Sequence, residues 1–105
     1  MKFLITMRRR DGVPMPPEVI AGMLLAQRDW LQERLDDGTL DCAYTFAQGG
    51  GGCGIVNAES GEELARIVAS SPLFGMSDID VQPLADISTI EGSAAALRRA
   101  VGAPA

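Results

Sequence analysis

A proline in the second half of the chain constrains the fold more than any other residue. Pro72 cannot continue a helix, so the helical pattern before it must end there. From residue 77 to residue 84 the sequence alternates, with Ile79 and Val81 on one side and two aspartates on the other. A period of two is typical of a strand with one apolar face. The segment therefore predicts a helix, a tight connection and then a strand.

The rest of the chain divides into further strand and helix patterns. A glycine turn over residues 49–52 separates two of the strands, and Ser60 begins a capping-box pattern that opens a helix. We expect strands over residues 2–9, 40–48, 53–58 and 77–84, and helices over residues 17–37, 60–71 and 94–101. Without the last helix, the order is the β-α-β-β-α-β of the ferredoxin-like fold. The predicted class is α+β, a four-stranded antiparallel sheet with two helices on one face.

The opposite face of this sheet also needs cover. We expect it to carry Leu4 and Val56, which are too apolar to face water. Two chains that pair sheet to sheet bury both faces with isologous contacts, so we expect a homodimer. The whole chain, residues 1–105, is expected to form one domain, with a core over about 1–90 and a C-terminal helical extension over 91–105.

Composition and charge limit the kinds of partner that the chain is expected to bind. The net charge of −5 disfavours nucleic acid, because phosphate binding needs a basic surface. No apolar stretch is long enough to cross a bilayer, and residues 1–9 lack the apolar core of a signal peptide, so we expect a cytoplasmic protein without a membrane partner. Cys42 and Cys53 should stay reduced, and two cysteines without histidine do not make a zinc site. We expect no metal and no cofactor.

The absence of histidine limits the chemistry. Proton transfer near neutral pH must use a carboxylate, a cysteine, a lysine or Tyr44, the one tyrosine. We expect Tyr44 beneath the helices, on the strand face that carries Cys42 and Phe46. There its hydroxyl could donate a proton to a developing enolate oxygen, with a carboxylate as base. The alternative is a core tyrosine that bonds a buried amide. Tyr44 is the candidate catalytic residue, and the sequence selects no particular carboxylate.

Gln27 is the polar exception in the apolar arc of the first helix. A short buried amide must be hydrogen-bonded or reach a wet cavity, so a ligand pocket and a plain buried hydrogen bond both remain open. The expected partner of Gln27 is Tyr44. The glycine run is better explained as a mobile hairpin that could cover a cavity than as a phosphate loop. The residues expected to contact a small-molecule substrate are Gln27, Trp30, Phe46, Gln48 and Phe74.

Several of these motifs, in this order, resemble the muconolactone isomerase family over residues 31–90. The resemblance lies in Gly38-Thr39 with Leu40, Tyr44, the helix start at Ser60 to Leu64, Pro72-Leu73-Phe74 and Asp78-Ile79. It implies a dimeric α/β barrel and a cofactor-free isomerase, which moves a carbon–carbon double bond in an unsaturated lactone by removing and returning a proton. It also implies dimers and larger rings of dimers.

The chain departs from the family pattern at several positions. It has Thr45 where the family usually has arginine, and Gly51, Gly52 and Cys53 where the family has an aromatic residue, asparagine and a second aromatic residue. The histidine after the fourth strand is also missing. These changes remove much of the polar and aromatic lining, so we do not expect muconolactone itself as the substrate.

Three functions therefore remain. The first is a cofactor-independent isomerase or cyclase acting on an unsaturated lactone or polyketide-like molecule, in secondary metabolism. The second is a cofactor-free monooxygenase of the same barrel architecture. The third is a non-catalytic ligand-binding or assembly module. Polar groups in an enclosed cavity favour the enzymes, and a cavity filled by side chains favours the third function.

Overall fold

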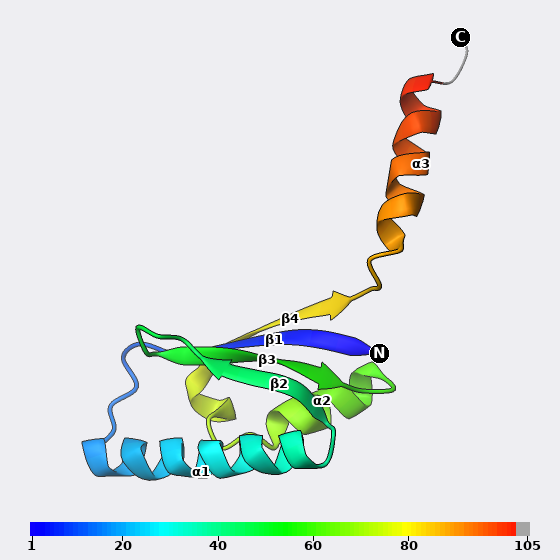
Figure 1. Ribbon diagram of the computed structural model, residues 1–105. Coiled ribbons are helices and arrows are strands. Elements are labelled where there is room, and N and C mark those ends of the chain that lie inside the picture. The colour runs from blue at the N-terminus through cyan, green and yellow to red at the C-terminus, as the bar shows by residue number, and fades with distance from the viewer. Residues whose placement is uncertain (103–105) are drawn as a thin grey trace.

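The computed structural model describes residues 1–102 as a four-stranded sheet with two helices on one face and a third helix that projects from it (Figure 1). All neighbouring strands are antiparallel, in the order β2-β3-β1-β4. This arrangement confirms the predicted α+β class. The elements are β1 (Lys2–Arg9), α1 (Pro17–Asp36), β2 (Leu40–Thr45), β3 (Gly51–Asn57), α2 (Gly61–Ala69), the short 3-10 helix η1 (Phe74–Met76), β4 (Ser77–Leu84) and α3 (Thr89–Gly102).

The helix ends follow from local sequence. Helix α1 starts at Pro17, whose ring fixes the first helical turn, and it is followed by Gly38 at a φ of 83°. At the start of α2, Ser60 Oγ accepts a hydrogen bond from the Glu63 amide at 3.1 Å. The Glu63 carboxylate in turn accepts one from the Glu59 amide at 3.1 Å. The predicted capping of α2 is therefore confirmed.

Strands β2 and β3 contain an irregularity that changes which side chains face the helices. Leu40 pairs with Val56, but Cys42 pairs with Ile55, so the register shifts by one residue between Leu40 and Cys42. Because side chains alternate along a strand, this shift inverts the faces of the rest of β2. The prediction that Tyr44 and Cys42 lie on the strand face beneath the helices is therefore wrong.

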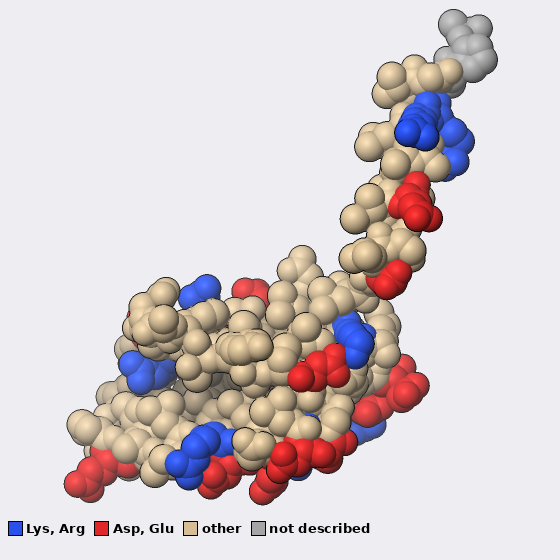
Figure 2. All heavy atoms as spheres, viewed as in Figure 1, with Lys and Arg blue, Asp and Glu red and all other residues tan. Residues whose placement is uncertain are grey.

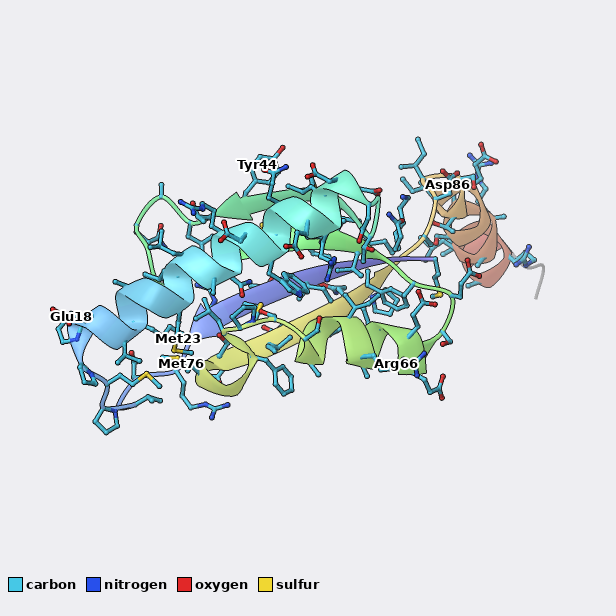
Figure 3. All side chains as sticks on the ribbon, turned by 90° about the horizontal axis from the view of Figure 1, so that it is seen from below. Glu18, Met23, Tyr44, Arg66, Met76 and Asp86 are labelled. Carbon is cyan, nitrogen blue, oxygen red and sulfur yellow. The ribbon has the colours of Figure 1, made fainter. Side chains whose placement is uncertain are left out.

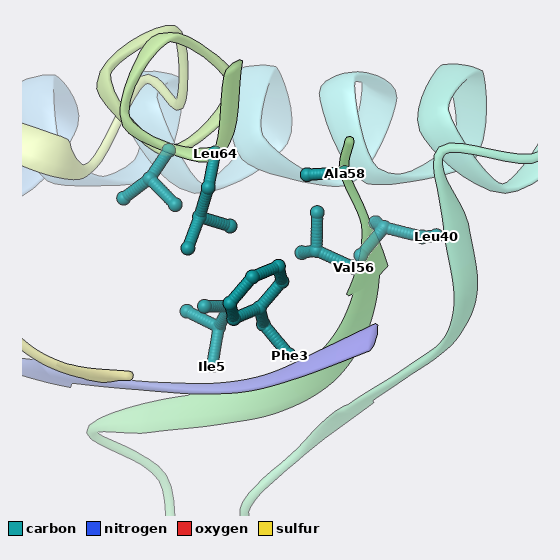
Figure 4. Close-up of a cluster of buried hydrophobic side chains, with 7 residues drawn as sticks. Phe3, Ile5, Leu40, Val56, Ala58 and Leu64 are labelled. Atoms are coloured by element: carbon teal, nitrogen blue, oxygen red, sulfur yellow. The ribbon is translucent and has the colours of Figure 1, made fainter. Parts of the chain in front are cut away.

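The core lies between the sheet and α2 (Figure 4). Leu64 and Val68, one turn apart on α2, pack onto the sheet, and Val56 is only 3% exposed. Burying each such aliphatic side chain contributes about 1.5–3 kcal/mol. Val56 thus lies on the helix-covered face, which corrects the expectation that it faces away from the helices. The buried cluster comprises Phe3, Ile5, Leu40, Val56, Ala58, Leu64 and Val68.

The face of the sheet opposite the helices has an apolar centre. Its middle is made by the half-buried Leu4 on β1 and its pairing partner Ile55 on β3. Near one end, Lys2 forms an ion pair with Asp41 and a hydrogen bond with Asn57. The acidic side chains seen in Figure 2 gather mostly on the helix side of the molecule. No helix in residues 1–102 combines the length and apolarity needed to cross a membrane.

Candidate functional site

A cavity of about 590 Å³ lies between α1 and the helix-facing side of the sheet. Its walls are mostly apolar, with Leu24 and Leu31 from α1, Met7 from β1 and Met76 from the segment after α2. Small-molecule sites typically measure about 300–1,000 Å³ and combine apolar walls with a few polar groups. The cavity is therefore large enough for a small organic ligand.

The floor of the cavity is open because β2 and β3 carry small residues there. Ala43 lies opposite Gly54 and Thr45 opposite Gly52. A Cβ atom at Gly52 would lie 2.4 Å from the Tyr44 carbonyl oxygen, so the backbone leaves no room for a side chain. Gly51 and Gly52 belong to β3, which corrects the expectation that residues 49–52 form a turn. The turn itself uses Gly49 and Gly50, both at positive φ.

Gln27 provides the polar group at the centre of the α1 wall. Its side chain is only 9% exposed, and its Oε1 accepts a hydrogen bond of 2.7 Å from Ser71 Oγ. The Leu73 amide also donates to Oε1, at 3.4 Å. Because a backbone N–H can only donate, the atom beside Leu73 must be the oxygen of the Gln27 amide. Nε2 therefore points away from Leu73.

The Nε2 group of Gln27 has no protein partner within residues 1–102, so its two N–H bonds are free to donate. In the described part of the chain, no fully buried side-chain nitrogen or oxygen lacks a hydrogen bond. Nε2 must therefore reach open space, and the cavity is the space that Gln27 borders. An acceptor oxygen of a ligand could bind there. The sequence left open a ligand pocket and a plain buried hydrogen bond for Gln27. Both features are present, because its Oε1 is hydrogen-bonded to protein and its Nε2 borders the cavity.

Two aromatic residues predicted for the site also border the cavity. Trp30 donates a hydrogen bond of 3.0 Å from Nε1 to Ser70 Oγ, and the Arg34 guanidinium lies 5.7 Å from the centre of its ring. Phe46 is half-buried, with the Arg8 guanidinium 4.7 Å from its ring centre. Cation–π contacts of this kind help to fix the orientation of an aromatic ring. The structure therefore brings Gln27 and Trp30 to one cavity. Phe46 borders it, but its ring lies beside Arg8, which follows Leu4 and Thr6 on the face opposite the helices.

The structure does not place Tyr44 beneath the helices. Tyr44 borders the cavity wall through edge strand β2, but it pairs with Cys53 on the opposite face and its side chain is 69% exposed. In Figure 3, which views the helix side, Tyr44 lies at the outer margin of the sheet. The register shift in β2 is the physical reason, since it reverses the face. The partner of Gln27 is Ser71 and not Tyr44.

Two further predicted site residues also lie away from the cavity lining. Gln48 is exposed in the turn between β2 and β3, and it does not line the cavity although its neighbours Ala47 and Gly49 do. Phe74 is 44% exposed, because it begins η1 while its neighbours Leu73 and Met76 turn inward. Sequence reasoning missed Ser71. Its place immediately before Pro72, at the end of α2, was the signal that could have indicated it.

The charged groups at the cavity are cationic. Arg9 and Arg28 border it, Arg28 being paired with Asp29 at 3.1 Å, and within residues 1–102 no aspartate, glutamate or histidine lines it. A separate, open depression of about 250 Å³ lies beside Asp37 and Thr39. There, hydrogen bonds from Thr39 lower the pKa of Asp37. The main cavity thus offers donors and positive charge to an acceptor oxygen. In the described part of the chain, no group of three or more His, Cys, Asp or Glu side chains could hold a metal.

The sequence profile described as muconolactone delta-isomerase matches residues 1–88. The chain belongs to the muconolactone delta-isomerase family. No curated protein matches the sequence significantly. The fold is similar to that of a crystal structure of muconolactone isomerase, with a TM-score of 0.73 and 23% identity over 82% of this chain and 90% of that one.

A second similar structure is 5-chloro-2-hydroxyhydroquinone dehydrochlorinase (TftG) from Burkholderia phenoliruptrix AC1100, in complex with 2,5-dihydroxybenzoquinone. Its TM-score is 0.64, with 20% identity over 85% of this chain and 98% of that chain. At these identities the likeness concerns the fold. Membership of the family supports a small-molecule isomerase role for this chain, without specifying a substrate.

Proposed function

We propose that the chain is a cofactor-independent isomerase or cyclase that acts by proton transfer on a small unsaturated lactone or polyketide-like molecule. The observation that carries this proposal is the unpaired Nε2 of Gln27 at the wall of a mostly apolar cavity. A ligand with an apolar body and one carbonyl or carboxylate oxygen matches both features.

In this chemistry a proton leaves the carbon next to a carbonyl, and negative charge develops on the carbonyl oxygen. The two N–H bonds of Gln27 would hydrogen-bond that oxygen, and the nearby Arg9 would favour its charge, whereas Arg28 is already paired with Asp29. The proton then returns at another carbon, so the double bond moves and no redox cofactor is needed. No carboxylate or histidine of residues 1–102 borders the cavity, so the proton would pass to a water molecule and return from water.

The lack of a carboxylate or histidine at the cavity, within residues 1–102, favours a second function. This is a non-catalytic binding module for the same class of ligand. Without a base beside the ligand, the cavity would bind an oxygenated molecule and leave it unchanged. The dehydrochlorinase of similar fold was solved with 2,5-dihydroxybenzoquinone, a small ring with several acceptor oxygens. This quinone is therefore a suitable binding probe under either function.

We also propose a cytoplasmic homodimer that takes part in secondary metabolism. The half-buried apolar centre at Leu4 and Ile55 supports pairing through the sheet face opposite the helices. The free thiols of Cys42 and Cys53, both half-buried on that face, are compatible with a reducing compartment.

The test of the chemistry is proton exchange. An unsaturated butenolide with an apolar side chain is incubated in D2O with the protein, and NMR follows deuterium uptake and movement of the double bond. An isomerase accelerates both, and Gln27→Leu should slow them by about a hundredfold. Quinone binding without any exchange would reject the isomerase in favour of the binding module.

A further inference from the structure

Helix α3 lies outside the part of the chain that matches the family. The family match ends at residue 88, and α3 covers Thr89–Gly102. The helix projects from the sheet, on the side opposite α1 and α2 (Figure 1), and it has no buried residue. Helices of about 12–15 residues are only marginally stable in water without packing. A projecting helix of 14 residues therefore needs a surface to pack against.

The large apolar residues of this segment, together with Ala94, form one stripe. They are separated by three, four, three and four residues, which is the spacing of the a and d positions of a coiled coil. Three of them have large exposed side chains within α3, with Ile90 at 67%, Leu97 at 66% and Val101 at 86%. The stripe comprises Ile90, Ala94, Leu97 and Val101 within α3, and Ile87 in the turn before the helix continues its spacing. Such a narrow a/d seam is typical of pairing with a second helix.

Two charged residues of α3 indicate the identity of the second helix and its orientation. Glu91 and Arg98 are seven residues apart, so both take the e position beside the apolar stripe. Within residues 1–102 neither side chain forms an ion pair. In an antiparallel pair, e positions face each other, and Glu91 of each copy lies beside Arg98 of the other. In a parallel pair, e faces g, where this helix has Ser93 and Ala100.

We propose that α3 pairs in antiparallel orientation with α3 of a second copy of this chain. Leu97 of each copy then packs against Ala94 of the other, and Ile90 packs against Val101. The small residues Ala94, Ser93 and Ala100 allow the two backbones to approach closely. This pairing is independent of the proposed chemistry, because α3 contributes no residue to the cavity lining.

The first test is sedimentation velocity of the full chain and of Leu97→Asp at micromolar concentrations. The variant should lose one association step, seen as a halved mass or a dimer dissociation constant raised by about tenfold or more. Hydrogen exchange by mass spectrometry should show α3 amides losing protection while β1 and β3 keep theirs, which excludes general unfolding. An unchanged mass with unchanged α3 protection would overturn the proposal.

Charge reversal then tests the partner and its orientation. Arg98→Glu places a second carboxylate beside Glu91 of the other copy and should weaken association about threefold to tenfold at low salt. The double variant Glu91→Arg/Arg98→Glu restores both pairs and should restore the affinity. Arg99→Glu is the matched control, since residue 99 lies at the f position, away from the seam. If the double variant stays weak, or Arg99→Glu weakens association equally, α3 docks on another surface and the proposal is wrong.

Discussion

Ser71 Oγ donates a hydrogen bond of 2.7 Å to Oε1 of Gln27, and this contact joins α1 to the end of α2 across 44 residues of sequence. Both residues are buried, at 9% exposure for Gln27 and 5% for Ser71. The bond fixes the direction of the Gln27 amide, so that its oxygen faces protein and its nitrogen faces the cavity. One structural contact therefore determines how the candidate site presents its donor.

The energetic coupling of this pair can be measured by a double-mutant cycle. Gln27→Leu leaves the Ser71 hydroxyl without its acceptor, and Ser71→Ala removes the donor from Gln27. We expect each single change to lower the free energy of unfolding by about 1–3 kcal/mol. Urea denaturation of both single variants and the double variant should give a coupling energy of about 1 kcal/mol. Strictly additive effects would show that the contact does not stabilise the fold.

Ligand binding should depend on Gln27 and not on Gln48. Trp30 is the one tryptophan and borders the cavity, so its fluorescence reports directly on occupancy. We expect 2,5-dihydroxybenzoquinone to quench it, and Gln27→Leu to weaken binding by about tenfold through loss of a hydrogen bond to the ligand. Gln48→Leu is the matched control, because its exposed amide does not line the cavity. Equal losses in both variants would contradict the assignment.

Tyr44→Phe tests whether a residue on the sheet face opposite the helices takes part in ligand binding or proton exchange. Because the side chain of Tyr44 is exposed on the face opposite the helices, we expect this variant to bind the quinone as tightly as the unchanged protein. Its proton-exchange activity, where present, should also be unaffected. A loss of about a hundredfold in exchange, the usual effect of removing a catalytic donor, would return Tyr44 to the active site.

The open floor of the cavity depends on the close approach of β2 and β3. Gly52→Ala places a Cβ atom 2.4 Å from the Tyr44 carbonyl oxygen, so the strands must separate. We expect a loss of about 1–3 kcal/mol in unfolding free energy. Gly22→Ala in α1 is the control, because its Cβ meets no atom within 4 Å and alanine should stabilise the helix by up to about 1 kcal/mol. If both variants have equal stability, the proposed crowding at Gly52 is absent.

Asp41 gives a prediction for pH. Hydrogen bonds from Lys2 and Asn57 lower the pKa of its carboxyl from the ordinary value of 3.8. A lowered folded-state pKa contributes stability above the unfolded-state pKa, and that contribution is lost as pH falls through the folded-state value. NMR titration should therefore give a midpoint for Asp41 below 3.8, and Lys2→Met should raise it. A midpoint that does not change in Lys2→Met would contradict this cause.

The strand and helix order could be predicted from sequence because each element has a local signal. Pro72, Gly38 and the Ser60 cap act within a few residues of themselves, so their effects do not depend on tertiary structure. The face of Tyr44 could not be predicted in this way. It depends on an extra residue between Leu40 and Cys42, and nothing in the local alternation shows a bulge.

The candidate site was predictable only in part, for a similar reason. Gln27 has a clear signal, since it is a short polar residue in an apolar helix face. Its bond to Ser71 joins two helices distant in sequence, and only their packing reveals it. The glycine run suggested a flexible loop, whereas the strands need glycine there because their backbones lie so close together.

The central claim is that the side-chain amide of Gln27 binds an acceptor oxygen in the cavity. Its most direct test is the side-chain 15N–1H signals of Gln27, assigned by their absence in Gln27→Leu and followed as 2,5-dihydroxybenzoquinone is added. We predict that the Gln27 signals shift and saturate together with Trp30 quenching, while those of Gln48 stay in place. Gln27 signals that remain unshifted at millimolar quinone, or that move no more than those of Gln48, would contradict the claim.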